Sequence, residues 1–97
     1  MTALPVPGQA VRHIDGGYYR VLTRARSADD QSPLVVYVHL WPFDTTGDPW
    51  VRPLSEWQSR FVAVAEQDVE TARRSDRAAA QHAVTAAKAV RRSLTRR

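Results

Sequence analysis

The stretch from Leu34 to Trp41 constrains the fold more than any other part of the chain, because it alternates two kinds of side chain. A period of two is that of a β-strand, whose successive side chains point to opposite faces of a sheet. We expect a central strand with its aliphatic face in the core. The other face carries rings that either form a second small core under a C-terminal helix or hold a ligand. The aliphatic set is Leu34, Val36, Val38 and Leu40, and the alternate set is Val35, Tyr37, His39 and Trp41.

Turn residues divide the chain before and after this strand. Asp15-Gly16-Gly17 predicts a hairpin between an extended segment over 10–14 and a second strand over 18–26, because glycine tolerates the positive φ of tight turns. Polar residues 27–33 predict a turn, and 42–49 a longer loop. Residues 50–53 predict a brief strand that ends at a proline. In the second strand, the expected inward side chains are Tyr19, Val21, Thr23 and Ala25.

Residues 53–65 allow two interpretations. Leu54, Trp57 and Phe61 have helical spacing, so a continuous helix from Pro53 onward is one of them. The preferred interpretation is a single helical turn through 54–57, followed by a last strand near 61–64. Periodicity alone does not decide between them.

Residues 66 to about 93 predict one long helix, because alanine is abundant and glycine and proline are absent. The small and apolar residues along it repeat at alternating spacings of three and four, which is typical of a helix–helix contact. The helix therefore either packs on another helix, including its own copy, or projects into solvent. The repeating set is Ala80, Ala83, Ala87, Val90 and Leu94.

These elements predict a mainly β fold with a C-terminal α-helix. The expected architecture is a small SH3-like antiparallel barrel of about five strands, closed on itself and followed by one long alanine-rich helix. We expect an N-terminal arm over 1–9, the barrel over 10–65, and a basic helix and tail over 66–97.

Composition narrows the function classes. A chain of 97 residues without cysteine has no disulfide framework and no thiolate zinc site. No carboxylate pair or serine elbow accompanies the histidines, so we expect neither a catalytic residue nor a metal or cofactor. The chain shows no signal-peptide pattern and no membrane-length apolar run, which favours a cytoplasmic protein without a membrane partner.

The charge is unevenly distributed. The formal net charge is +4, yet the arginines and acids of residues 1–65 balance, and the excess lies near the C-terminus. Such a basic tail can neutralise the phosphates of a nucleic acid, or simply keep the end of a helix solvated. The candidate nucleic-acid-binding residues are Lys88, Arg91, Arg92, Arg96 and Arg97.

Six residues of the β region are candidates for ligand contact. A cation and an imidazole before the hairpin can bind an anion, and an arginine beside a tryptophan can hold a planar ring or form a structural pair. Tyr19, Trp57 and Phe61 are expected in the core instead, and His82 on the helix surface. The six candidates are Arg12, His13, Tyr37, His39, Trp50 and Arg52.

Four short motifs, in order and at fitting spacings over about residues 10–64, resemble a small bacterial family catalogued as domain of unknown function sixteen-fifty-three. The resemblance implies a compact β-rich domain similar to SH3-like barrels, and it implies no activity. Asp15 departs from the family pattern, which has a lysine there. The motifs are Arg12-His13 with Gly16-Gly17, Tyr19 with Val21 and Leu22, Val35-Val36-Tyr37, and Trp50-Val51-Arg52-Pro53-Leu54.

Three functions remain open from the sequence. The first is a non-catalytic binding module that recognises a nucleic acid or a nucleotide through the aromatic and arginine face, assisted by the basic tail. The second is a protein-interaction adaptor that binds an extended peptide, or dimerises through the alanine-rich helix. The third is a small enzyme acting on a phosphate-bearing substrate through His13.

Overall fold

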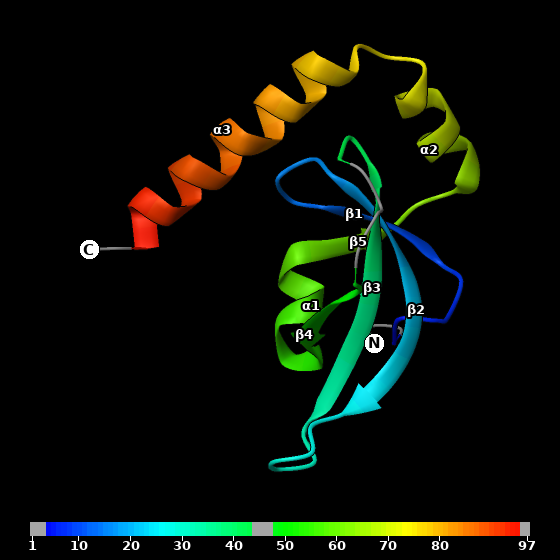
Figure 1. The fold of residues 1–97 in the computed structure, drawn as a ribbon, viewed down its shortest axis with the longest axis vertical. Helices are drawn as coiled ribbons and strands as arrows, with labels where there is room; N and C mark the ends of the chain where they lie inside the picture. The colour runs from blue at the N-terminus through cyan, green and yellow to red at the C-terminus, as the bar shows by residue number, and fades with distance from the viewer. Residues whose placement is uncertain (1–3, 44–47, 96–97) are drawn as a thin grey trace.

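The computed structural model describes residues 4–43 and 48–95 (Figure 1). Strands and helices alternate only after the first three strands, and two helices end the chain. The elements are β1 (Ala10–His13), β2 (Tyr18–Arg26), β3 (Pro33–Trp41), β4 (Trp50–Pro53), α1 (Leu54–Arg60), β5 (Phe61–Ala63), α2 (Glu66–Arg73) and α3 (Arg77–Thr95).

The five strands form one antiparallel sheet in the order β4-β3-β2-β1-β5. The mainly β fold with a C-terminal helix is therefore confirmed, but the expected closure into a barrel is wrong. Among the described strands, β4 and β5 are the two edges and do not pair with each other. The chain enters α1 directly after Pro53, so a helix occupies the place where two edge strands would have to meet.

The hairpin predicted at Asp15-Gly16-Gly17 joins β1 to β2. Gly16 has a φ of 105°, a conformation that glycine adopts without strain. The His13 amide donates to the Gly17 carbonyl at 2.8 Å, and the Gly16 amide donates to the His13 carbonyl at 2.8 Å. This turn keeps Asp15 buried at the end of the sheet that α3 crosses.

The order of elements in the preferred interpretation of residues 53–65 is confirmed, since a short helix precedes a final strand, but the helix extends to Arg60, beyond the predicted single turn. α1 ends where Phe61 adopts an extended conformation and its amide donates to the Trp57 carbonyl. The Trp57 and Phe61 rings stack with centroids 3.9 Å apart. Both side chains are buried, so this turn of chain brings two large rings onto one face of the sheet.

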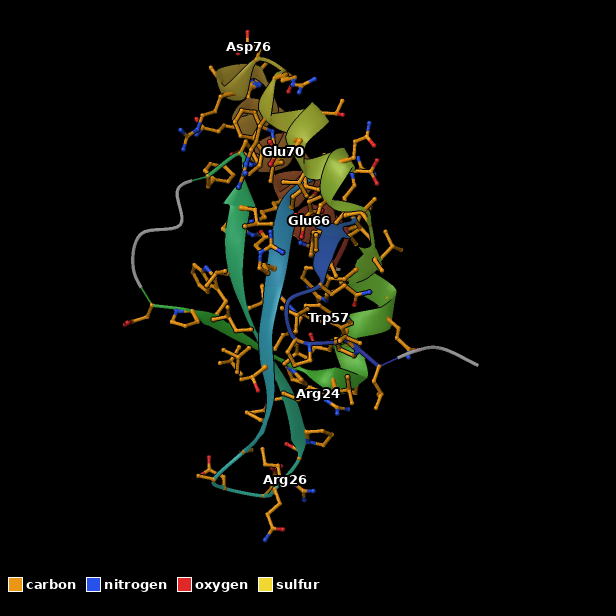
Figure 2. All side chains as sticks on the ribbon, turned by 90° about the vertical axis from the view of Figure 1, so that its right-hand side faces the viewer. Arg24, Arg26, Trp57, Glu66, Glu70 and Asp76 are labelled. Atoms are coloured by element: carbon orange, nitrogen blue, oxygen red, sulfur yellow. The ribbon has the colours of Figure 1, made fainter. Side chains whose placement is uncertain are left out.

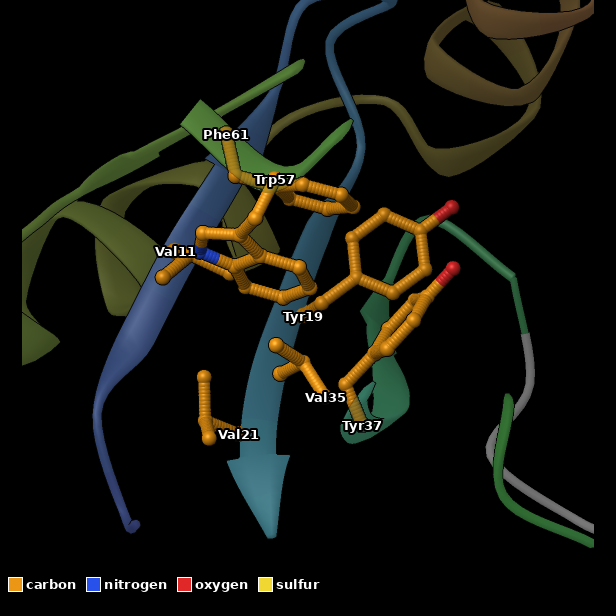
Figure 3. Close-up of a cluster of buried hydrophobic side chains, with 7 residues drawn as sticks. All are labelled: Val11, Tyr19, Val21, Val35, Tyr37, Trp57 and Phe61. Atoms are coloured by element: carbon orange, nitrogen blue, oxygen red, sulfur yellow. The ribbon is translucent and has the colours of Figure 1, made fainter. Parts of the chain in front are cut away.

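The core lies on the face of β3 opposite to the one we expected. Val35 and Tyr37 are 0% and 5% exposed, whereas the alternate aliphatic residues are only half-buried. The reason is that α1 packs on the ring-bearing face, where the Tyr37 and Trp57 centroids are 5.3 Å apart. Helix α2 also contacts β3, and Val69 of this helix is completely buried. Figure 3 shows the core cluster, which consists of Val11, Tyr19, Val21, Val35, Tyr37, Trp57 and Phe61.

The predicted inward set of β2 holds only for its first half. Tyr19 and Val21 are buried, but Thr23 is exposed and Ala25 is half-buried. The pairing register with β3 shifts between Val21 and Thr23, which leaves Leu22 without a partner. A bulge of this kind adds one residue to the strand and disrupts strict alternation.

The single long helix predicted over residues 66–93 is wrong, because the chain forms α2 and α3 with a break at residues 74–76. Asp76 accepts a hydrogen bond from the Ala79 amide at 3.1 Å, so it caps the start of α3. Ser75 donates to the Ala72 carbonyl at the end of α2. Two local side-chain hydrogen bonds thus favour a break where neither glycine nor proline is present.

Helix α3 passes over the end of the sheet, as Figure 1 shows, and docks there through side chains outside the alanine repeat. Arg77 and Gln81 both donate to the Pro42 carbonyl at 2.9 Å, and Val84 is 3% exposed. Val90 and Leu94, the apolar members of the predicted seam, are 61% and 62% exposed. The helix therefore packs on the β domain with the end of its seam exposed, whereas Ala80 and Ala87 are half-buried.

Two tryptophans provide a matched test of this core. We expect Trp57→Ala to lower the free energy of unfolding by about 3–5 kcal/mol, because it removes a buried ring and leaves a cavity. Trp50→Ala, at a side chain that is 62% exposed, should change it by less than about 1 kcal/mol. Urea unfolding followed by circular dichroism measures both. Equal losses in the two variants would contradict the assignment of the core.

Candidate functional site

A cavity of about 660 Å³ opens beside the core, between the sheet and α3. Strands β1 to β4 supply most of its ring-bearing side chains, Phe43 follows β3, and α3 supplies two cations. Its described lining consists of His13, Tyr19, Tyr37, His39, Phe43, Asp48, Pro49, Trp50, Arg52, Lys88 and Arg91.

Two tyrosines belong to both the core and the cavity. The Tyr19 and Tyr37 rings are 5.3 Å apart and edge to face, and both side chains are nearly buried. Figure 3 shows their hydroxyl groups side by side, pointing away from Val11 and Val21. Burial raises the pKa of Tyr19 to about 12, so this hydroxyl keeps its proton and can donate a hydrogen bond.

His13 is held in one neutral form. Its Nδ1 accepts a hydrogen bond from the Asp15 amide at 3.0 Å, which requires a lone pair on that atom. The Asp15 carboxylate lies 3.3 Å from the same nitrogen and would favour a proton there. Burial outweighs this attraction and lowers the pKa of His13 to about 4. At neutral pH, His13 therefore carries its proton on Nε2.

His39 is neutral as well, but its proton is on Nδ1 and not on Nε2. Burial lowers its pKa to about 4, although a hydrogen bond with the backbone of Trp41 acts to raise it. A bond that raises the pKa is donated by the ring to a carbonyl. Nε2 is buried without a partner in the described part of the protein, so the donor is Nδ1. Nε2 then presents a lone pair.

Three cations surround the rings. The Arg52 Nε donates to the Tyr37 hydroxyl at 3.4 Å, and its Nη1 lies 3.2 Å from a Glu56 carboxylate oxygen. Arg91 forms an ion pair with the buried Asp15 carboxylate.

Lys88 makes no ion pair with any of the described residues, and burial lowers its pKa. Nearby Arg91 and Arg92 lower it further, whereas Asp15 raises it. A half-buried cation without a counter-ion is electrostatically unfavourable unless an anion joins it. The cavity therefore suits a ligand with negative charge.

The cavity unites five of the six predicted ligand residues, and Arg12 is the exception. Arg12 lies at a separate hollow of about 490 Å³, where its guanidinium is 6.0 Å from the centre of the Tyr18 ring. Strand alternation explains the separation, because Arg12 and His13 point to opposite faces of β1.

The basic residues after position 87 divide into three groups. Lys88 and Arg91 line the cavity, and Arg92 lies on the same helix. Arg96 and Arg97 lie outside the described residues.

Sequence reasoning missed Tyr19 as a site residue, because we assigned it to the core alone. It also missed Asp15, Phe43, Asp48 and Pro49. The signals for Asp15 were an acid in a glycine-rich turn and a departure from the family pattern, and neither reveals a partner 76 positions later. The other three follow β3 or precede β4, in a region whose sequence predicts only a loop.

Two absences can be stated for residues 4–43 and 48–95. No helix among them is long and apolar enough to cross a membrane. No group of three or more histidine, aspartate or glutamate side chains there is placed to hold a metal ion.

One comparison with known proteins gives a match. A family model described as Protein of unknown function (DUF1653) matches residues 9–76. The match extends past the region of about residues 10–64 that carries the motifs, and it ends one residue before α3 begins. No significant match was found among curated proteins or among solved structures.

The lowered histidine pKa values predict a pH-dependent stability. Between about pH 4 and pH 6.5, the unfolded chain binds protons at His13 and His39 that the folded chain does not bind, so stability falls as pH is lowered through this window. At pH 5 the loss is roughly 2 kcal/mol for each histidine. His39→Gln should remove its share of the loss, whereas His82→Gln, at an exposed position of α3, provides the control.

Urea unfolding at pH 7 and pH 5 measures this difference for the parent chain and both variants. If His39→Gln and the parent lose the same free energy of unfolding between the two pH values, His39 is not a buried neutral imidazole.

Proposed function

Because the chain belongs to the family described as Protein of unknown function (DUF1653), a description that states no activity, we propose its function from the cavity. We propose a non-catalytic binding module that works in the cytoplasm and recognises a nucleotide, free or within a single-stranded nucleic acid. The observation that carries this proposal is the unpaired, half-buried Lys88 facing a cavity walled by aromatic rings.

The cations favour a phosphate. Lys88 can supply a point charge, and Arg52, which is also paired with Glu56, can supply a planar guanidinium; these are the two usual partners of phosphate oxygens. Arg91 adds positive charge but is already paired with Asp15. The acid of the described lining, Asp48, is exposed and lies on the loop before β4. The cavity can therefore accept an anion without first breaking the Asp15–Arg91 ion pair.

The rings favour a base. Trp50 borders the cavity with 62% of its surface exposed, so its flat face is available for stacking. Tyr19 and Tyr37 are buried on their faces and offer their hydroxyl groups instead. Stacking on an exposed indole, with phosphate held by nearby cations, is a common way for proteins to bind single-stranded nucleic acid.

The histidines favour binding over catalysis. General acid–base catalysis is most efficient when the catalytic group has a pKa near the working pH. The pKa values of His13 and His39 are both about 4, so both imidazoles stay neutral at pH 7 and act as hydrogen-bonding groups. A binding site requires only hydrogen bonding from these two imidazoles.

Binding affinity measured by titration calorimetry tests the proposal with AMP and with single-stranded DNA and RNA. We expect Lys88→Ala and Trp50→Ala each to weaken binding by roughly tenfold, which corresponds to about 1.4 kcal/mol. Arg26→Ala removes an exposed cation at the end of the β2–β3 hairpin, where Arg26 pairs with Pro33 and not with a residue beside the cavity (Figure 2), and should leave affinity unchanged. Affinity for the oligonucleotides should fall steeply with added salt.

The absence of binding to all three ligands at low salt would contradict the proposal. So would an equal loss of affinity in Lys88→Ala and Arg26→Ala, because affinity would then depend on net charge and not on the cavity.

Self-association through α3 is a second candidate function, favoured by the exposure of Val90 and Leu94 four residues apart on one helix face. The occupant would be the same face of a second copy. Sedimentation equilibrium should then give a dimer for the full chain and a monomer for Leu94→Asp. A monomeric parent chain at all concentrations would contradict it.

A further inference from the structure

We propose that His39 selects the base of the bound nucleotide, because its Nε2 atom accepts a hydrogen bond from an exocyclic amine of that base. The cavity should therefore prefer amine-bearing bases over bases in which that amine is missing. This inference rests on the proposed function and adds a specificity-determining residue to it.

The first support is the position of the atom. His39 lines the cavity, is 7% exposed, and its Nε2 has no hydrogen-bond partner in the described protein. Buried polar atoms in folded proteins are nearly always paired, so an unpaired one on a side chain that lines a cavity indicates where a ligand atom belongs.

The second support is that the imidazole can only accept at this atom. A hydrogen bond with the backbone of Trp41 acts to raise the pKa of His39, so the ring donates it, and the donor is Nδ1 because Nε2 has no partner in the described protein. A neutral ring has one proton, so Nε2 carries the lone pair. A ligand group that bonds to it must be an N–H or an O–H donor. The exocyclic amine is the only N–H donor on the base edge of adenine in a nucleotide.

The third support is that the imidazole is fixed in orientation. Its centroid lies 4.3 Å from that of Tyr19 on one side and 5.3 Å from that of Phe43 on another. A Cβ atom at Gly17 would lie 3.6 Å from His39 Cε1 and 3.2 Å from Tyr19 Cε1, so the backbone closes the space beside both rings. These contacts restrict rotation of the ring away from this orientation.

Neighbouring groups complement this acceptor. The Tyr19 hydroxyl keeps its proton and lies beside the Tyr37 hydroxyl (Figure 3). A base edge that presents an amine next to a ring nitrogen, as adenine does, can donate to His39 and accept from a hydroxyl.

A chemical double-mutant cycle tests this inference. AMP and purine riboside 5′-monophosphate differ only in the amine, and both keep the phosphate. The parent chain should bind AMP roughly tenfold more tightly, whereas His39→Phe should bind the two nucleotides about equally. His82→Phe, on the exposed face of α3, should retain the full preference. His39→Gln keeps an acceptor oxygen near the Nε2 position and should retain part of it.

The outcomes separate this inference from the proposed function. If the parent binds both nucleotides equally and Lys88→Ala weakens both, the role of His39 is wrong and the binding module stands. If neither nucleotide binds to the parent, both proposals fall. A preference for AMP that persists undiminished in folded His39→Phe or is absent from folded His39→Gln would also overturn the role of His39. Circular dichroism confirms folding of each variant.

Discussion

The packing of aromatic rings on one face of the sheet is the interaction on which both the fold and the cavity depend. Trp57 stacks on Phe61, which contacts Tyr37 and Tyr19 edge to face, and Tyr19 contacts His39. Trp57, at one end of this series, belongs to α1, whereas Tyr19 and His39, at the other end, line the cavity. The same rings therefore bury apolar area, which stabilises the fold, and form the rigid wall of the candidate site.

This shared wall also accounts for the electrostatics of the site. Rings that exclude water disfavour the charged form of any neighbouring imidazole, which is why burial is the largest cause of the low pKa values of His13 and His39. The same exclusion weakens the hydration of Lys88, whose pKa is also lowered by burial. Where water is excluded, a hydrogen bond or ion pair with a ligand is stronger than on an open surface. The core thus sets the strength of the polar contacts beside it.

The sequence predicted the strands, the first hairpin and the short helix before Phe61, because turn residues and periodicity are local signals. It could not predict which face of β3 enters the core. Alternation defines two faces, but the choice between them depends on where Trp57 packs, which is a contact between distant residues. The same dependence on contacts between distant residues explains why we assigned Tyr19 to the core alone. A side chain can be buried on its faces and still present its hydroxyl to a cavity, and only the assembled structure shows both.

The cavity joins two parts of the chain that are separable in sequence. Its ring-bearing residues lie within the family match over 9–76, whereas Lys88 and Arg91 lie on α3, which begins at the next residue. The contacts that hold α3 in place include the two hydrogen bonds to the Pro42 carbonyl, the Arg77 guanidinium over the Trp41 ring, the buried Val84 and the Asp15–Arg91 ion pair. Since Lys88 lies one turn before Arg91, these docking contacts also fix the position of the unpaired cation. The docking of α3 therefore determines the positive charge of the cavity, and the sheet determines its shape.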